Sequence, residues 1–183
     1  PEEAMLGATA RLPLGALLND IAEPYRGEDL EISVEIDARG ETPPQVWRAP
    51  ALLHGLGNII ENAADFARSH VRVQASFDAS QLRVSVEDDG PGFAPEIFER
   101  IGEPYITSRP GHHALGESEL GPSAELGQHE GMGLGFFIAK TLLEQTGGTV
   151  KAVNLPGGGA RIDVFWPRGV IDGESPPTQS QED

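Results

Sequence analysis

Three polar side chains recur at helical spacing in the middle of the sequence. Asn58, Asn62 and Asp65 occupy positions i, i+4 and i+7, so on a helix they would line one narrow stripe. Carboxamides at this spacing offer oxygen atoms to a hard cation and N–H groups to phosphate oxygens. Asn is a poor helix former, so two of them within one helix suggest a binding role. Taken alone, however, the stripe is better explained as a solvated helix face.

A second candidate is the run Asp88-Asp89-Gly90-Pro91-Gly92, which follows a strand-like segment. A carboxylate at a strand end can accept a hydrogen bond from the amino group of a nucleotide base. The glycines would let the backbone approach the flat ring closely. A plain acidic turn is the alternative. A calcium loop is disfavoured because no Asp-x-Asp-x-Asp run with a following Glu is present.

The third candidate is Gly131-Met132-Gly133-Leu134-Gly135, which precedes a helical pattern. Closely spaced glycines at a helix start can hold phosphate through backbone N–H groups and the helix dipole. The run is neither a P-loop, which ends in Gly-Lys-Ser/Thr, nor a dinucleotide fingerprint, which follows a strand. Alone it could be a simple loop-closing turn. The order and spacing of the three segments together favour one nucleotide site, with the long loop between the second and third as its lid.

Helices and strands at regular spacing would position these segments. The strongest helical pattern covers residues 50–68, and others cover residues 13–22 and 136–145. Alternating apolar and polar residues predict five strands, at 30–36, 71–77, 82–86, 149–153 and 160–165. Short turns between strand pairs indicate an α+β fold. We expect a two-layer α/β sandwich, a mixed, mostly antiparallel sheet covered by helices on one face.

Composition restricts the partners of the chain. Its 183 residues have a formal net charge of −16, which disfavours contact with nucleic acid or anionic lipid. The absence of Cys excludes disulfides and thiolate chemistry from this sequence. No apolar run is long enough to cross a bilayer, so we expect a cytoplasmic domain without direct membrane contact. The sequence begins at Pro1 rather than Met, so we expect a fragment of a larger protein.

Four segments in order resemble the histidine-kinase branch of the ATPase superfamily that includes gyrase, the 90-kilodalton heat-shock chaperones and MutL. They are an N box (Asn58-Ile59-Ile60-Glu61-Asn62-Ala63), a first glycine box (Asp88 to Phe93), an F box (Glu103 to Arg109) and a second glycine box (Gly131 to Gly135). The resemblance covers residues 46–167 and implies the Bergerat-type ATP-binding fold. Residues 57–67 and 102–105 are also similar to the RegB/PrrB group of redox-responsive kinases.

The resemblance implies specific roles in binding Mg²⁺ and ATP. Asn62 would give an oxygen to Mg²⁺ and Asn58 would lie beside the phosphates. Asp88 would accept the adenine amino group. Further ATP-binding positions would be Asp65, Phe66, Gly90, Gly92, Tyr105, Thr107, Arg109, Gly131, Met132, Gly133, Leu134 and Gly135. Asp65 departs from the pattern because many relatives have Lys there. A positive charge that would neutralise phosphate is therefore missing, and Arg109 would compensate for it. Ala160 stands where Ser or Thr is common.

The implied activity is transfer of the ATP γ-phosphoryl group to a histidine on a separate dimerisation domain, which then serves a response regulator. Hydrolysing relatives carry a Glu base where this chain has Asn58, whose amide cannot deprotonate water, so rapid hydrolysis is not expected. The five histidines lack the context of a phosphoacceptor, so the acceptor histidine would not lie in this fragment. We expect no acid or base catalyst in it either. Two alternatives stay open: a degenerate ATP-binding or interaction module, and a gyrase- or MutL-like ATPase.

The expected organisation follows. Residues 1–12 would be the remnant of a linker to the dimerisation domain, and residues 13–168 the catalytic domain with its lid at 104–131. Residues 169–183, rich in Pro, Ser, Gln and acidic residues, would form a disordered tail. Whether the whole kinase is anchored in an inner membrane stays open.

Overall fold

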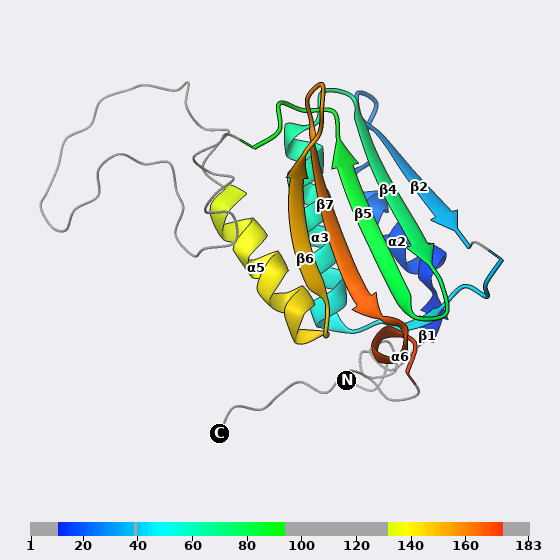
Figure 1. Cartoon of the computed structure of the whole chain (residues 1–183). Helices are drawn as coiled ribbons and strands as arrows, with labels where there is room; N and C mark the ends of the chain where they lie inside the picture. Colours follow the sequence, from blue (N-terminus) through cyan, green and yellow to red (C-terminus); the bar gives the residue numbers. More distant parts are fainter. Residues whose placement is uncertain (1–10, 39, 94–131, 174–183) are drawn as a thin grey trace, which may run out of the picture.

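The computed structural model of the chain describes residues 11–38, 40–93 and 132–173. These residues form two layers, with a five-stranded sheet on one side and helices covering one of its faces (Figure 1). The predicted α+β sandwich is therefore confirmed.

The sheet consists of β2 (Glu31–Asp37), β4 (His70–Phe77), β5 (Gln81–Asp88), β7 (Ala160–Pro167) and β6 (Thr149–Asn154), in that spatial order. Only the pair β2–β4 is parallel among these five strands. The inward positions of the central strands, such as Val73, Val84 and Val164, are fully buried. Side chains alternate between the two faces of a strand, so every second residue of these strands faces the helices. The sheet is thus mixed and mostly antiparallel, as predicted.

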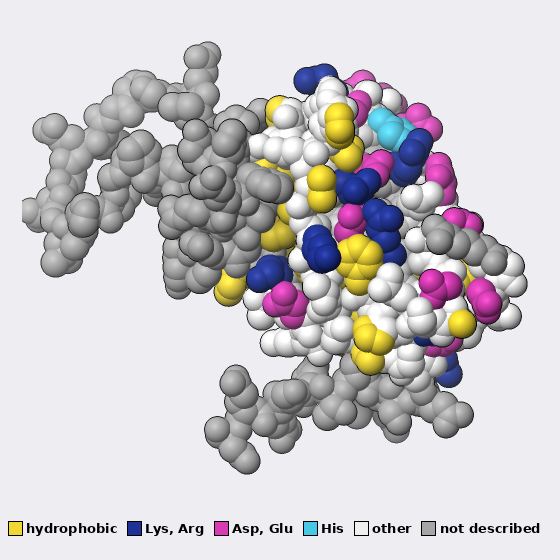
Figure 2. Space-filling view, viewed as in Figure 1, with side chains coloured by type: hydrophobic (Ala, Val, Ile, Leu, Met, Phe, Trp, Pro, Cys, Tyr) yellow, Lys and Arg dark blue, Asp and Glu magenta, His cyan; other side chains and the backbone are white. Residues whose placement is uncertain are grey.

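The other face of the sheet is polar. Figure 2 shows basic and acidic side chains intermingled across it. At its centre the buried carboxylate of Asp163 accepts hydrogen bonds from Arg83 and Ser85, and Arg83 also lies over the ring of Phe165. These partners satisfy a carboxylate that would otherwise be costly to bury.

Helices α2 (Leu14–Ala22), α3 (Pro50–Phe66) and α5 (Met132–Gln145) form the second layer, and the short 3-10 helix η1 (Glu23–Tyr25) follows α2. Helix α3 begins at Pro50, in its first turn. Proline lacks a backbone N–H, but an N–H there would have no partner within the helix, so its absence costs no helix hydrogen bond. Helix α5 packs closely on α3, because a Cβ atom on Gly55 would lie 2.6 Å from Cγ of Leu143. This close approach places the end of α5 beside the first half of α3, and the start of α5 lies against Asn62, because a Cβ atom on Gly135 would lie 3.4 Å from its Oδ1.

A small ribbon of two strands was not predicted. β1 (Arg11–Pro13) pairs antiparallel with β3 (Gln45–Trp47), and Val46 is fully buried. Three-residue strands are too short to show an alternating pattern. Residues 11 and 12 therefore belong to the folded body, and the expected linker can only include residues that precede them.

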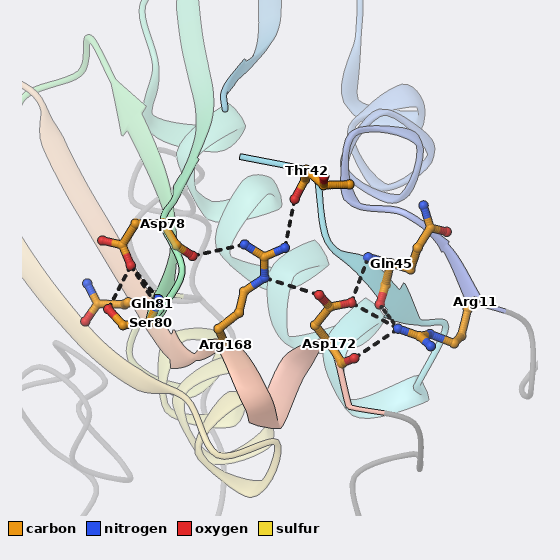
Figure 3. Close-up of polar contacts among 8 residues, drawn as sticks. All are labelled: Arg11, Thr42, Gln45, Asp78, Ser80, Gln81, Arg168 and Asp172. Carbon is orange, nitrogen blue, oxygen red and sulfur yellow. Dashed lines mark hydrogen bonds and ion pairs between the residues drawn. The ribbon is translucent and has the colours of Figure 1, made fainter. Parts of the chain in front are cut away.

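The chain beyond β7 also belongs to the folded body. Helix α6 (Arg168–Ile171) buries Ile171, and Gly173 O accepts a hydrogen bond of 3.0 Å from Nε1 of Trp47. Figure 3 shows Arg168 and Asp172 of this segment joined to Thr42, Gln45, Asp78 and Arg11. The prediction of a disordered tail is therefore wrong for residues 169–173, because these contacts hold them. Residues 174–183 lie outside the described residues.

None of the helices in the described residues combines the length and apolarity needed to cross a membrane.

Candidate nucleotide-binding site

A cavity lies where α3, the end of β5, the start of β7 and α5 meet. Its walls are mainly apolar, with Asn62 and Asp88 among the polar exceptions. The lining residues are Ile59, Asn62, Ala63, Phe66, Val86, Asp88, Gly92, Phe93, Phe136, Ala160 and Ile162. The structure thus brings together the predicted amide, the acidic strand end and the helix that follows the second glycine run.

The cavity is narrow as it stands. Its enclosed volume is about 20 Å³, within a hollow of about 420 Å³ that includes open solvent. The enclosed part has room for about one water molecule. A purine ring would therefore have to occupy the open hollow or displace wall residues such as Phe136.

Asn62 carries an unpartnered polar atom at this cavity. Its Nδ2 is buried and has no hydrogen-bond partner within the described part of the chain. A Cβ atom on Gly135 would lie 3.4 Å from Oδ1 of Asn62, so the first turn of α5 lies against the amide. A buried donor without an acceptor costs free energy, which a ligand with acceptor oxygens would recover.

Asp88 is positioned by the alternation of β5, because Val84, Val86 and Asp88 all face the helices. Its Oδ1 accepts hydrogen bonds from the backbone N–H groups of Gly90 at 2.9 Å and Ala160 at 3.4 Å. Burial raises the pKa of the Asp88 carboxyl, the two N–H groups oppose that rise, and the charge of Asp89 adds to it. Within the described residues, Oδ2 accepts no hydrogen bond, so it remains available to a ligand.

Asp89 serves a different purpose from its neighbour. Its carboxylate accepts hydrogen bonds from the backbone N–H groups of Arg68, Ser69 and His70 and from the hydroxyl of Ser69. Burial alone would raise the pKa of Asp89, but these hydrogen bonds outweigh it and lower the pKa to about 2. Asp89 thus fixes the connection between α3 and β4, beside the cavity.

The two glycines after these acids are required by their surroundings. A Cβ atom on Gly90 would lie 2.3 Å from the carbonyl oxygen of Phe66. Gly92 has a φ of +78°, which residues with a side chain rarely adopt. The backbone of the following residue, Phe93, is held by the side chain of Asn154. Its Oδ1 accepts a hydrogen bond from the Phe93 N–H, and its Nδ2 donates one to the Phe93 carbonyl oxygen, both at 2.8 Å. Sequence reasoning missed Asn154, because a single Asn at the end of a strand carries no distinctive signal.

The predicted polar stripe on α3 divides in the structure. Asn58 lines a second, open groove instead of the cavity, and Asp65 is exposed. Asn62 follows Asn58 by four residues, which rotates its side chain about 40° beyond a full turn of the helix. Asp65 follows Asn58 by seven residues, which leaves its side chain about 20° short of two turns. Asn58 and Asp65 therefore point in similar directions, while Asn62 turns towards α5.

The remaining predicted positions are only partly described. Met132, Gly133 and Leu134 form the first turn of α5, so this helix begins four residues earlier than the predicted start at Phe136. Tyr105, Thr107, Arg109 and Gly131, together with most of the predicted lid, lie outside the described residues. Among the described residues, no three or more His, Cys, Asp or Glu side chains are grouped so that they could hold a metal ion. A cation here would need amide or ligand oxygens.

Residues 48–170, which make up more than half of the chain, match the family described as histidine kinase-, DNA gyrase B-, and HSP90-like ATPase. The chain belongs to this family. The sensor histidine kinase RegB of Cereibacter sphaeroides is 37% identical over 169 residues, which cover 85% of this chain and 35% of RegB. The sensor histidine kinase CpxA of Escherichia coli K12 is 32% identical over 129 residues, covering 68% of this chain and 25% of CpxA.

Solved structures of histidine kinases share the fold. Full-length ShkA in complex with AMPPNP is 26% identical with a TM-score of 0.63, and the match covers 93% of this chain and 33% of ShkA. The mycobacterial sensor histidine kinase MprB is 22% identical with a TM-score of 0.60, covering 86% of this chain and 97% of the MprB chain. The chain is thus a histidine-kinase-type ATP-binding domain, and its predicted similarity to the RegB group is confirmed. It spans about a third of the length of RegB.

Proposed function

We propose that this domain binds Mg·ATP and transfers the γ-phosphoryl group to a histidine on a separate dimerisation domain. It would do so in the cytoplasm, as part of a two-component kinase that serves a response regulator. One observation carries the proposal: Asn62 and Asp88 flank a single apolar cavity, each with a polar atom that lacks a partner in the described residues. The two atoms differ in chemistry. One is an amide donor and the other a carboxylate acceptor.

The two atoms suit the opposite ends of a nucleotide. The free oxygen of Asp88 matches the amino group of adenine, and the apolar walls, such as Val86 and Ile162, match its ring. The amide of Asn62 can donate to phosphate, or turn its oxygen to a cation, since the two orientations are nearly equivalent in shape. Mg²⁺ held there would neutralise phosphate charge.

The residue at position 58 supports transfer rather than hydrolysis. In the transfer, an imidazole nitrogen forms a bond to the γ-phosphorus while the bond to the bridging oxygen breaks, and ADP keeps that electron pair. The imidazole N–H proton leaves to solvent or to a base on the acceptor. Asn58 cannot take a proton from water, because an amide is not a base at neutral pH. Positioning and electrostatics would supply most of the catalysis.

The test combines binding and transfer. ATP affinity is measured by calorimetry with and without Mg²⁺, and labelled ATP is then mixed with the domain that carries the acceptor histidine. We expect Mg²⁺-dependent binding and labelled phosphohistidine, and Asn62→Ala should reduce both at least tenfold. Binding without transfer would instead favour a degenerate module. Rapid steady-state hydrolysis by the isolated chain would favour a gyrase- or MutL-like ATPase.

A further inference from the structure

The side chain of Asn154, at the end of β6, holds the backbone of a residue 61 positions earlier in the chain. Its Oδ1 accepts a hydrogen bond from the N–H of Phe93, and its Nδ2 donates one to the carbonyl oxygen of Phe93, both at 2.8 Å. One amide thus meets both polar groups of a single backbone residue, as a neighbouring strand would. Two hydrogen bonds to one residue fix its orientation as well as its position.

The turn that follows Asn154 packs on the same segment. A Cβ atom on Gly92 would lie 3.0 Å from Oδ1 of Asn154 and 3.0 Å from the carbonyl oxygen of Gly159. A Cβ atom on Gly159 would lie only 2.1 Å from the carbonyl oxygen of Asp88. The turn is closed by a hydrogen bond of 3.0 Å from the N–H of Leu155 to the carbonyl oxygen of Gly159. Backbone therefore lies directly on backbone here, and Asn154 adds a side chain that holds the end of the segment.

Asn154 lies next to the nucleotide cavity without lining it. Asp88, Gly92 and Phe93 all line the cavity, whereas Asn154 does not. The side chain of Phe93 is buried in the wall, because the residue is only 8% exposed. Asn154 itself is exposed, so its replacement leaves no void in the core. Its contribution is therefore the placement of the backbone at Gly92 and Phe93.

A simple structural role is the alternative, and Asn19 of α2 provides an example of it. Asn19 is also exposed, and its amide also makes two hydrogen bonds. Its Nδ2 donates to the carbonyl oxygen of Gly15 at 2.9 Å, and its Oδ1 accepts from Nη2 of Arg26 at 3.0 Å. Neither partner lines the nucleotide cavity. Asn19 is therefore a matched control for Asn154.

Resting on the proposed function, we infer that Asn154 is a positioning residue for the nucleotide base. Its amide holds Gly92 and Phe93 so that the base side of the cavity is formed before the nucleotide arrives. A ligand then does not have to order this segment, and a preformed site binds more tightly than one that is ordered on binding. Asn154 acts on the binding of the base, whereas Asn62 is the proposed contact of the phosphates.

The test compares adenosine, which has the base but no phosphate, with Mg·ATP. NMR titration gives the Kd for adenosine and calorimetry the Kd for Mg·ATP. Asn154→Leu removes both hydrogen bonds, and Asn154→Asp sets a carboxylate oxygen against the carbonyl oxygen of Phe93. Each should raise both Kd values about tenfold, while Asn19→Leu should change them less than twofold. Asn62→Ala should instead weaken Mg·ATP far more than adenosine.

Transfer kinetics and stability separate positioning from folding. In the transfer reaction, the KM for ATP should rise about tenfold in both Asn154 variants, with kcat within twofold. Asn154→Leu and Asn19→Leu should lower the melting temperature by similar amounts, because each removes two hydrogen bonds of an exposed amide. Only the Asn154 variants should change the Kd for adenosine.

Unchanged Kd values for adenosine in both Asn154 variants would overturn the inference. A smaller number of binding sites with an unchanged Kd would also overturn it, because that result indicates only a loss of folded chain. Failure of the proposed function has a different signature. The unmodified chain would then bind adenosine but transfer no phosphoryl group, and Asn154→Leu would still weaken adenosine binding. An unmodified chain that binds neither adenosine nor Mg·ATP would overturn both proposals.

Discussion

Nη2 of Arg11 lies 3.0 Å from Oδ1 of Asp172, joining two residues that are 161 positions apart in the sequence (Figure 3). The same carboxylate accepts a hydrogen bond of 3.0 Å from the backbone N–H of Gln45 and one of 3.2 Å from Nε of Arg168. Arg11 also lies over the ring of Trp47, with 5.7 Å between its guanidinium carbon and the ring centroid. The first and last described segments are thereby held against the β1–β3 ribbon.

Removing the Asp172 carboxylate should lower the stability of the domain. Asp172→Ala leaves Arg11, Arg168 and the Gln45 N–H without their shared acceptor, so we expect a loss of about 1–2 kcal/mol. Urea unfolding followed by circular dichroism measures it. The control is Glu35→Ala, which removes a more exposed ion pair with Arg72 at 3.7 Å and should cost less than about 0.5 kcal/mol. Equal losses in the two variants would contradict a special role for Asp172.

Asp89 should make stability depend on pH at acid values. Its pKa is about 2 in the folded chain against an ordinary 3.8, so folding favours the ionised form. The stabilisation is complete above about pH 4 and is lost as the pH falls from 3.8 through about 2. Asp89→Asn should therefore be less stable at pH 7 by about 1–2 kcal/mol and lose less stability on acidification.

The measurement for Asp89 is urea unfolding at several pH values between 7 and 2. Asp29→Asn, at an exposed position, is the control and should follow the pH dependence of the unmodified chain. Identical pH profiles for Asp89→Asn and the unmodified chain would show that the hydrogen bonds to Arg68, Ser69 and His70 do not control this titration.

Asp88→Asn should change the base preference of the cavity. The N–H groups of Gly90 and Ala160 hold the Oδ1 position as an acceptor, so the amide NH₂ of Asn would face the ligand. That donor opposes the amino group of adenine and suits the carbonyl of guanine. ATP affinity should fall about 10- to 100-fold, while the preference for ATP over GTP narrows or reverses. Calorimetric titration with both nucleotides checks this, and undiminished ATP binding would refute the assigned contact.

Gly90→Ala should destabilise the fold next to the site. The added Cβ would meet the backbone oxygen of Phe66 at 2.3 Å, and a backbone atom cannot move aside as a flexible side chain can. We expect a loss of about 1–3 kcal/mol and weaker nucleotide binding. Gly27→Ala is the matched control, because nothing lies within 4 Å of its added Cβ, and its melting temperature should change little. A Gly90→Ala chain as stable as Gly27→Ala would contradict the close approach.

Much of the site follows from local periodicity, which is written in the sequence. The alternation Leu82, Val84, Val86 carries Asp88 to the helix-facing side of β5, because successive side chains of a strand point to opposite faces. Helical spacing of Leu52, Leu56 and Ile59 fixes which side of α3 is buried. These patterns predicted the two-layer fold, and the order of the three polar and glycine-rich segments predicted that Asn62 and Asp88 would line one site.

Contacts between distant segments could be decided only by the tertiary structure. The sequence placed Asn58, Asn62 and Asp65 on one stripe, but the packing of α5 at Gly135 and of η1 on the other side of α3 assigned Asn62 to the cavity and Asn58 to the groove. The β1–β3 ribbon and the Arg11–Asp172 pair likewise join segments that no local pattern relates. Periodicity determines which side of an element is buried, whereas the neighbour on each side depends on how the whole chain packs.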